Sequence, residues 1–412
     1  SLGWALCVPE TQQQKVTNYH AKVVSRPEEI KLPNVTLGPK EESEKAELPL
    51  DEKTNTAMKE MLFQDNLFIE EKPAFNKEEE IAVEKVKESF GFEDGRPITG
   101  LPFNDKEALL KNNMPVALKR LESTHAKLKK LEMEDEFQEK IDDALAKDYI
   151  EEVDDPEPEV GSKTYLPISV VIKQDRTTSK IRACMDASAK YKDVSLNDAL
   201  MQGPNIQEDM IKVLVRFRKN KFAVSMDVSE MFPQIIVRKQ DRNRLRFLVK
   251  KKGKIKIYRH KRVPFGLNCS PFLAQYTVLR SAEEKKLTKP IAYDLINLSR
   301  YVDDVCGSLD TKKEAIQALS EVPEVFKSCG MEVHKVLSND KDVLESIDVE
   351  KRLKKSKTKI LGVEYDADND TMNVAPVEET TCPTTKRGLL TLNAKVYDPL
   401  GKLSPNSVKG KL

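Results

Sequence analysis

Three aspartates in this 412-residue sequence have the surroundings expected of catalytic carboxylates. Asp227 lies in the apolar run KFAVSMDVSEMFPQIIV, and Asp303 and Asp304 lie together in LSRYVDDVCGSLD. Buried carboxylates that adjoin each other repel and lose hydration, so they are tolerated where a multivalent cation neutralises them. Carboxylate oxygens favour a hard cation such as Mg2+. The three residues therefore predict a metal site.

The flanking residues, and not the Asp-Asp pair itself, distinguish this position. The same pair occurs at 142–143, in a charged helical pattern, and at 154–155, in the acidic segment EEVDDPEPEV. Only the pair at 303–304 has apolar residues on both sides, which predicts the tight turn of a buried hairpin. Two metal ions about 3.5–4 Å apart need carboxylates from at least two separate elements to clamp a phosphoryl displacement. Asp227 and the 303–304 pair meet that requirement.

The elements that must position these acids follow from hydrophobic periodicity. Residues 75–155 repeat apolar side chains at helical spacing and predict a mostly helical extension. A turn-rich break at 151–160 precedes a region, 156–370, in which short β-branched runs alternate with amphipathic helices, as is typical of an α+β domain. Residues 1–74 are predicted to be a largely disordered linker, and 371–412 to begin a further region.

Individual elements can be assigned within these parts. The predicted core of the helical extension consists of Leu118, Leu121, Leu128, Leu131, Phe137, Ile141 and Leu145. Strands are predicted at 165–173, 179–188, 221–228 and 232–237, and helices at 270–286 and 312–330.

Composition excludes several classes of protein. The 69 Lys and Arg against 68 Asp and Glu give a net charge of +1, so the chain is neither a wholly basic nucleic-acid coat nor an acidic disordered protein. No apolar run is long enough to span a bilayer, and no membrane partner is expected. The six cysteines form no C-x-x-C pair, which favours reduced thiols in a cytosolic or nuclear compartment.

One local charge excess departs from this balance. Residues 237–262 contain 13 Lys or Arg against one Asp. The runs RLRFLVK and KIKIYRHK flank KKGK and predict a hairpin with basic and apolar residues interleaved. A polyanion partner is the first interpretation, because counterion release would supply affinity. An exposed, overcharged hairpin without a partner is the alternative.

Three segments in this order and spacing resemble motifs A, B and C of reverse transcriptases. They are SMDVSEMF at 225–232, RVPFGLNCSPF at 262–272 and YVDD at 301–304. KIRACMDASA resembles the fingers segment of that family, GMEVHK its motif D and KILGVEYD its primer-grip region. The resemblance implies a right-hand polymerase with fingers, palm and partial thumb, in which the helical extension precedes the fingers.

Further segments resemble one branch of the family, the Pao/BEL class of LTR retrotransposons. They are LGWALCVPE at 2–10, GLPFNDKE at 100–107, MDASAK at 185–190 and TKRGLLTLNAKVYDPLGKLSP at 385–405. By this resemblance residues 1–74 hold the remnant of a protease-domain C-terminus, and 371–412 begin the thumb or connection, a Pao-type region. The chain is then expected to be part of a Pol polyprotein, located in a cytoplasmic virus-like particle or in the nucleus.

The resemblance implies roles for the acids and for one lysine. Asp227 and Asp303 would bridge two Mg2+ ions, with Mn2+ as an alternative, and the Val228 carbonyl would be an added ligand. Asp304 would be the third acid of the set. Lys335 would donate a proton to pyrophosphate, although a surface lysine is an equal alternative at that position.

The nucleotide-binding side is implied in the same way. Lys180 and Arg182 would meet the incoming deoxynucleoside triphosphate, Arg182 through two hydrogen bonds. Phe232, five residues after Asp227, would exclude a ribose 2′-hydroxyl, unless it is only a core residue. Phe265 and Gly266 would lie against the base and sugar of that nucleotide. Phe265 stands where retroviral enzymes have Gln, so the role of that Gln does not carry over.

Contacts to an RNA or DNA template-primer are expected from the basic stretch and from the primer grip. The residues are Arg238, Lys250, Lys251, Lys252, Lys254, Lys256, Arg259, Leu361 and Gly362.

These features support an RNA-directed DNA polymerase, a nucleotidyltransferase. The alternative is a catalytically inactive or domesticated fragment that only binds nucleic acid. The sequence contains no Asp-Thr/Ser-Gly protease motif, and its four histidines do not form an integrase zinc site.

Overall fold

The computed structural model describes residues 5–6, 22–23, 75–153, 163–172, 181–375 and 385–404. The chain forms two compact units, of which the larger comprises Asn76–Ala375 and Ala394–Ser404. In the other unit, β1 (Ala5–Leu6) and β2 (Lys22–Val23) form an antiparallel pair. The linker predicted for 1–74 otherwise lies outside the described residues. Within the described part of the chain, no helix is long and apolar enough to cross a membrane.

A four-stranded antiparallel sheet forms the centre of the larger unit. Its strand order is β12-β13-β8-β14. The strands are β8 (Phe222–Ser229), β12 (Arg300–Tyr301), β13 (Asp304–Leu309) and β14 (Glu332–Ser338). Side chains alternate between its two faces. Val224, Met226 and Val228 point into the larger hydrophobic cluster, whereas Ala223 of the same strand packs into a second cluster.

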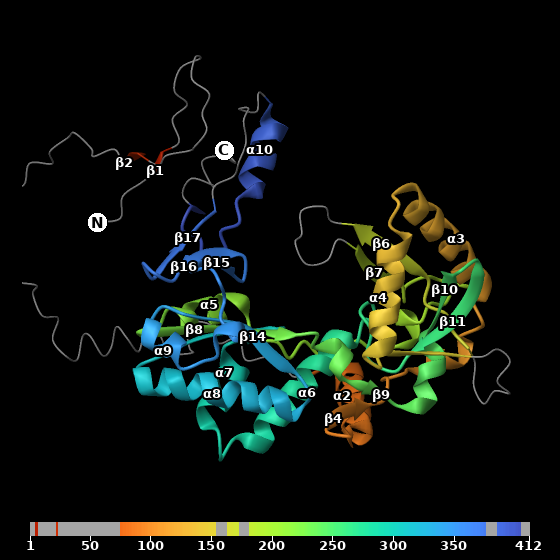
Figure 1. Cartoon of the computed structure of the whole chain (residues 1–412), viewed down its shortest axis with the longest axis horizontal. Coiled ribbons are helices and arrows are strands. Elements are labelled where there is room, and N and C mark those ends of the chain that lie inside the picture. The colour runs from red at the N-terminus through yellow and green to blue at the C-terminus, as the bar shows by residue number, and fades with distance from the viewer. Residues whose placement is uncertain are drawn as a thin grey trace, which may run out of the picture. The chain divides into compact units, whose positions relative to one another are not determined.

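Helices cover one face of this sheet, and a helix with a small sheet covers the other (Figure 1). On the first face lie α6 (Ser270–Lys285), α7 (Pro290–Leu298) and α8 (Lys312–Ser328). On the second lie α5 (Met210–Phe217) and the sheet of β15 (Lys357–Ile360), β16 (Val363–Asp366) and β17 (Thr371–Asn373). The short elements α9 (Lys341–Glu345) and η6 (Val349–Lys351) connect the two parts. This part corresponds to the palm that the resemblance implies.

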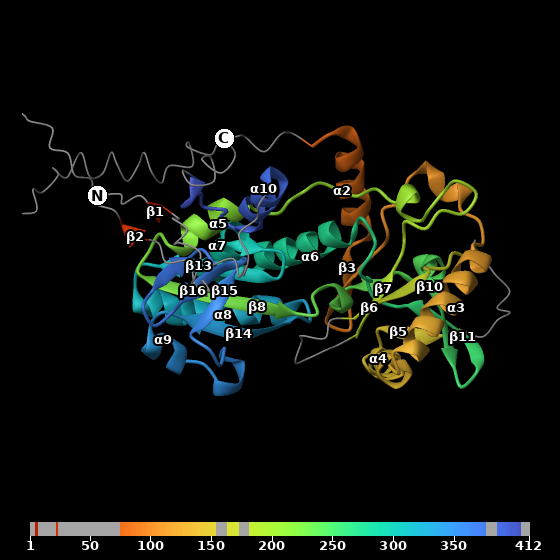
Figure 2. The same ribbon diagram turned by 90° about the horizontal axis from the view of Figure 1, so that it is seen from above.

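The part expected to form the fingers consists of two antiparallel ribbons, of three and two strands, packed on two helices. The elements are α3 (Met114–Lys130), α4 (Glu134–Ala146), β5 (Ile150–Glu152), β6 (Ile168–Ile172), β7 (Ile181–Met185), β10 (Arg246–Lys251) and β11 (Lys254–His260). β6 pairs with β7, and β11 lies between β10 and β5. Helix α3 is tied to β6 because the Thr124 hydroxyl donates to the Ile168 carbonyl at 2.8 Å. Figure 2 shows α3 and α4 beside these ribbons.

The segment before α3 also pairs with distant strands. It contains α2 (Lys77–Ser89), β3 (Gly91–Glu93), β4 (Arg96–Thr99) and η2 (Asp105–Leu109). β4 lies parallel to β9 (Ile236–Val237), with Ile98 opposite Ile236. The Arg238 guanidinium donates to the Ser89 carbonyl at 2.9 and 2.7 Å. Residues on both sides of the boundary expected near 155 therefore belong to one compact unit.

Most of the predicted elements are confirmed. The helical segments at 115–149 form α3 and α4, and Leu121, Leu128, Phe137 and Ile141 are buried there, with Leu118 and Leu145 packed at the edge. Leu131 is an exception: it ends α3 and is 45% exposed.

The strand predicted at 232–237 is shorter than expected. Only Ile236–Val237 is extended, and Phe232–Gln234 forms the 3-10 turn η4. Pro233 has no N–H to donate to a sheet, which favours the turn. The remaining short helices are η3 (Asn197–Ala199), η5 (Lys239–Leu245) and α10 (Lys386–Lys395).

The β10–β11 hairpin predicted around KKGK is confirmed, and its turn requires left-handed backbone conformations. Lys251 pairs with Lys254, and the two residues between them have φ of 50° at Lys252 and 77° at Gly253. Gly253→Ala is expected to lower the free energy of unfolding by about 1 kcal/mol, because a left-handed residue with a Cβ is strained. No atom lies within 4 Å of an added Cβ, so backbone strain is the only cost. Urea unfolding measures the change.

The matched control is Gly253→Asn, because Asn tolerates the left-handed region better than Ala. We expect Asn to cost less than Ala. Equal losses for the two variants would contradict the assignment of the strain to φ.

Candidate active site

Backbone pairing brings the three predicted acids to one place. Asp304 is the direct cross-strand partner of Asp227 in the β13–β8 ladder. Asp303 occupies the turn between β12 and β13, and its carbonyl accepts a hydrogen bond of 2.8 Å from the Val228 N–H. Cross-strand partners point to the same face of a sheet, so Asp227 and Asp304 share a face. They lie on the face that carries the second hydrophobic cluster, because Ala223 and Cys306 have the same alternation.

The turn that carries the acid pair is held from below by a buried arginine. Val302, at the head of the turn, has φ of 52°, which is a strained value for a β-branched residue. Arg300 is 3% exposed and donates to the Val302 carbonyl at 3.1 Å and to the side chain of Gln275 on α6. Burial lowers the pKa of Arg300 to about 10, so the guanidinium stays charged at neutral pH.

Repulsion and burial make the acids hard to ionise together. Burial, followed by the charges of Asp303 and Asp227, raises the pKa of Asp304 to about 7. Burial and the Asp227 charge also raise the pKa of Asp303, although its side chain is the more exposed of the two. These are the surroundings in which a carboxylate gains from a nearby cation.

A lysine and a histidine of β14 face Asp227. The Lys335 ammonium lies 2.6 Å from one carboxylate oxygen of Asp227, and the His334 ring nitrogen lies 3.6 Å from the other. His334 is the cross-strand partner of Asp227, and its Nε2 also lies 3.3 Å from the Ser229 hydroxyl. Sequence reasoning included Lys335 but missed His334. The available signal for His334 was its place directly before Lys335, in the segment GMEVHK that resembles motif D.

The donor set fits a divalent ion that takes part of its coordination from elsewhere. In the portion of the chain that the structure describes, no three carboxylate, imidazole or thiol side chains already converge as a closed metal site. Mg2+ is commonly held by one or two protein carboxylates, with water and substrate phosphates completing its shell. Asp227, Asp303 and Asp304 offer oxygen ligands from two adjacent strands and their turn. The role of the Val228 carbonyl as a ligand stays a prediction.

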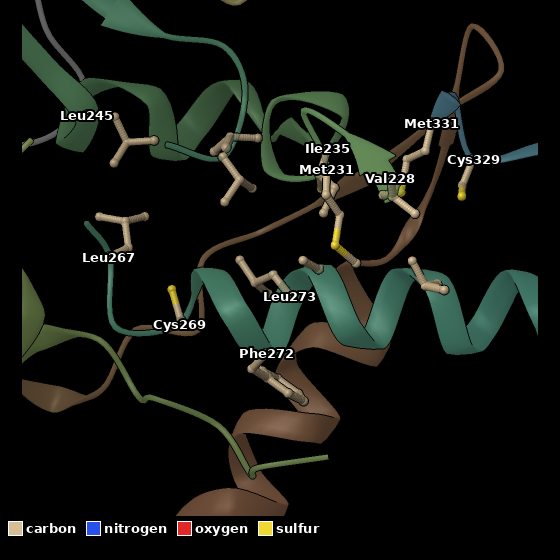
Figure 3. Packing of buried hydrophobic residues seen from close by; sticks show 14 of the residues in the cluster. Val228, Met231, Ile235, Leu245, Leu267, Cys269, Phe272, Leu273, Cys329 and Met331 are labelled. Atoms are coloured by element: carbon tan, nitrogen blue, oxygen red, sulfur yellow. The ribbon is translucent and has the colours of Figure 1, made fainter. Parts of the chain in front are cut away.

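Two phenylalanines predicted on the nucleotide side are in contact. The rings of Phe232 and Phe265 meet edge to face with centroids 4.7 Å apart. Phe232 is partly buried, whereas Phe265 is 58% exposed. Phe232 packs against the larger hydrophobic cluster, in which Figure 3 shows Met231 and Ile235 above α6 and Leu273 of that helix on the side facing them. Phe232 therefore has a packed base and one exposed neighbour.

Gly266 joins this region to the fingers strand β7. Its φ is 107°, and a Cβ at this position would lie 2.2 Å from the Met185 carbonyl oxygen, so the close approach requires glycine. Arg182, three residues before Met185 on β7, has an exposed side chain. Lys180 lies outside the described residues.

The predicted nucleic-acid contacts fall into two groups. Lys250, Lys252 and Lys254 are exposed around the β10–β11 turn, and none of the three forms an ion pair in the described part of the chain. The other basic side chains make internal contacts: Lys251 with Asp142 at 2.6 Å, Lys256 with Glu152, Arg259 with Glu151 at 2.7 Å, and Arg238 with Ser89. The local excess of 13 basic residues therefore overstates the charge available to a partner.

The predicted primer grip forms a tight turn of its own. Leu361 and Gly362 connect β15 to β16 with φ of 46° and 87°. The Tyr397 hydroxyl donates to the Leu361 carbonyl at 3.0 Å, and its ring would clash with a Cβ on Gly362. This turn lies at the end of the small sheet on the second face of the palm.

Comparison with known families matches residues 155–365, just over half of the chain, to the family described as reverse transcriptase (RNA-dependent DNA polymerase). No curated protein matches at a significant level.

Among solved structures, the chain resembles a foamy viral protease-reverse transcriptase dRH in complex with double-stranded DNA. Identity is 18% and the TM-score 0.42, over 63% of this chain and 38% of that one. For the foamy viral protease-reverse transcriptase in complex with an RNA/DNA hybrid, identity is 18% and the TM-score 0.42, over 68% of this chain and 33% of that one. For the foamy viral protease-reverse transcriptase in complex with double-stranded DNA, identity is 17% and the TM-score 0.40, over 66% of this chain and 46% of that one. The match to this chain spans less than half of each solved chain.

Asp304→Asn tests the electrostatic cost of the site. A carboxyl whose pKa is raised to about 7 holds its proton more tightly in the folded than in the unfolded state. Its contribution to stability is therefore lost as the pH rises from about 4 to about 7. Without divalent ions, we expect the variant to raise the free energy of unfolding by about 1–2 kcal/mol at pH 8, with little change at pH 4.5.

Urea unfolding in a chelator at the two pH values measures this difference. Asp310→Asn is the control, because Asp310 is an exposed aspartate just beyond the same strand. Destabilisation of Asp304→Asn at pH 8, or the same gain at both pH values, would show that repulsion does not dominate at Asp304.

Proposed function

This chain belongs to the reverse transcriptase family, and we propose that it is an RNA-directed DNA polymerase. It would transfer nucleotides from deoxynucleoside triphosphates to a primer 3′-hydroxyl on an RNA or DNA template. The observation that carries the proposal is the register of β13 on β8, which sets Asp304 opposite Asp227 beside the Asp303 turn. Carboxylates from separate elements are what a nucleotidyl transfer centre requires.

The family relationship supports a divalent metal requirement, and we propose two Mg2+ ions, with Mn2+ as an alternative. Asp227 and Asp303 would hold them, with Asp304 beside them. When bound, such ions lower the pKa of the primer hydroxyl and neutralise the triphosphate. The protein itself holds the acids in place. The Asp303 carbonyl accepts a hydrogen bond from the Val228 N–H, and Arg300 donates one to the Val302 carbonyl.

Lys335 is proposed to act on the leaving pyrophosphate. Its ammonium already lies 2.6 Å from Asp227. An ammonium at this distance neutralises the carboxylate while no other cation is present, and can turn toward a phosphate oxygen when one arrives. Proton donation from Lys335 to the leaving group would then complete the transfer.

The Pao/BEL class of LTR retrotransposons is the proposed source of this polymerase. Supporting it are the segments GLPFNDKE and MDASAK, the first of which has a structural role here. The Leu101 N–H donates to buried Asp241 at 2.9 Å, and buried Phe103 bridges to Leu200. A cytoplasmic virus-like particle or the nucleus is the proposed location.

Asp227→Asn is expected to abolish primer extension, with at least a ~10³-fold loss of rate, because no nearby side chain replaces the lost metal ligand. Extension of a DNA primer on an RNA template with Mg2+ measures the activity. A gel shift with the same template-primer should be nearly unchanged. Near-normal extension by Asp227→Asn would rule out the assignment, whereas binding without extension by the wild-type chain would favour the nucleic-acid-binding alternative.

Phe232→Val is expected to lower the preference for deoxynucleotides over ribonucleotides by about tenfold or more, because the smaller side chain leaves room for a 2′-hydroxyl. Single-nucleotide incorporation with each substrate measures the ratio. Phe326→Leu, in the core on α8, is the control for general loosening. An unchanged ratio in Phe232→Val would assign Phe232 to the core alone.

A further inference from the structure

One tyrosine of the fingers holds the residues on both sides of Phe232. The Tyr149 hydroxyl donates to the Glu230 carboxylate at 2.8 Å, and it accepts a hydrogen bond of 3.0 Å from the Gln234 side-chain amide. Glu230 stands two residues before Phe232, and Gln234 stands two residues after it. A single hydroxyl therefore spans the turn that carries the Phe232 ring.

The backbone of this turn needs such support. Glu230 has φ of 45°, and a residue other than glycine stays in that region only when its surroundings hold it there. Lys147 adds an ion pair of 3.0 Å to the same carboxylate, at an exposed position. Gln234 is 7% exposed, and its amide oxygen accepts a hydrogen bond from Arg96. The two ends of the turn are thus fixed by residues 96, 147 and 149.

The Phe232 ring packs at its base against the larger hydrophobic cluster and on its other side against the Phe265 ring. Its partner ring, Phe265, is itself 58% exposed and cannot act as a rigid wall. Rejection of a 2′-hydroxyl depends on the placement of a bulky group to within a fraction of an ångström. The position of the ring therefore depends on the turn that carries it, in addition to the packing at its base.

We propose that Tyr149 is a positioning residue that sets the preference for deoxynucleotides by fixing the turn around Phe232. The inference rests on the proposed polymerase function, because it names a specificity determinant of that same site. Burial and the Glu230 carboxylate raise the pKa of the Tyr149 hydroxyl, which therefore remains a hydrogen-bond donor at neutral pH.

A purely structural role for Tyr149 makes a different prediction. The hydrogen bonds also tie the residue before β5 to the segment after β8, and loss of such a tie would reduce activity with every nucleotide alike. A positioning role changes the ratio between nucleotides that differ only at the 2′ position. The ratio of kcat/KM for a deoxynucleotide to that for the matching ribonucleotide separates the two.

The test variant is Tyr149→Phe, which removes only the hydroxyl. We expect the ratio to fall about three- to tenfold, mainly through faster ribonucleotide incorporation. Thr124→Val is the matched control, because the Thr124 hydroxyl donates to the Ile168 carbonyl at 2.8 Å and its loss also removes one buried hydroxyl contact, outside every segment with a proposed site role. Its ratio should not change.

Two further variants make the inference stricter. In a Phe232→Val background, Tyr149→Phe should cause no additional change, because the ring it positions is absent. Glu230→Gln keeps an acceptor for Tyr149 but loses the Lys147 ion pair, so a smaller fall in the ratio is expected.

If the wild-type chain extends a primer and Tyr149→Phe leaves the deoxynucleotide-to-ribonucleotide ratio of kcat/KM unchanged, this inference alone is overturned. An equal fall in the Phe232→Val background would also overturn it. No extension by the wild-type chain with either nucleotide would overturn the proposed function and this inference with it.

Discussion

The antiparallel ladder between β13 and β8 sets two carboxylates opposite each other, at a separation where like charges oppose folding. The surrounding structure must therefore supply the free energy that this arrangement costs. Helices α6, α7 and α8 cover one face of the sheet, while α5 and the β15–β17 sheet cover the other. Arg300 adds a buried cation and two hydrogen bonds directly beneath the turn. The cluster of acids is therefore a local electrostatic cost that an extensive hydrophobic core offsets.

Charge in the fingers is arranged by the same principle of compensation. The basic strands β10 and β11 lie against the acidic α4–β5 segment, so that Asp142, Glu151 and Glu152 neutralise Lys251, Arg259 and Lys256. At the tip of the hairpin, Lys250, Lys252 and Lys254 are exposed and form no such pairs in the described structure. A template strand would encounter a basic tip of modest charge, and the strands behind it act mainly as a rigid support.

Local sequence patterns were sufficient to predict the helices, the strands and the three acids. They were insufficient to predict contacts between distant segments. Apolar residues around Asp227 and the Asp303–Asp304 pair marked strands and a turn, because the spacing of side chains within a strand is a local property. The pairing of residue 151 with residue 259 depends on where two remote segments meet, so the linear charge count overstated the free positive charge. Arg300 and Tyr149 were missed for the same reason. Nothing in the sequence around either residue shows that it reaches Val302 or Glu230.

The early strands β4 and β5 have consequences for how this chain folds. Each pairs with a strand that is synthesised much later. β4 pairs with β9, and β5 pairs with β11, where the paired residues Glu151 and Arg259 are 108 positions apart. Closing such long loops is entropically costly and slows folding relative to local pairing. During synthesis β4 and β5 must wait, with unpaired strand edges exposed to neighbouring chains, until β9 and β11 emerge. Nascent chains of this protein should therefore depend on chaperones more than a protein of similar size with local strand pairing.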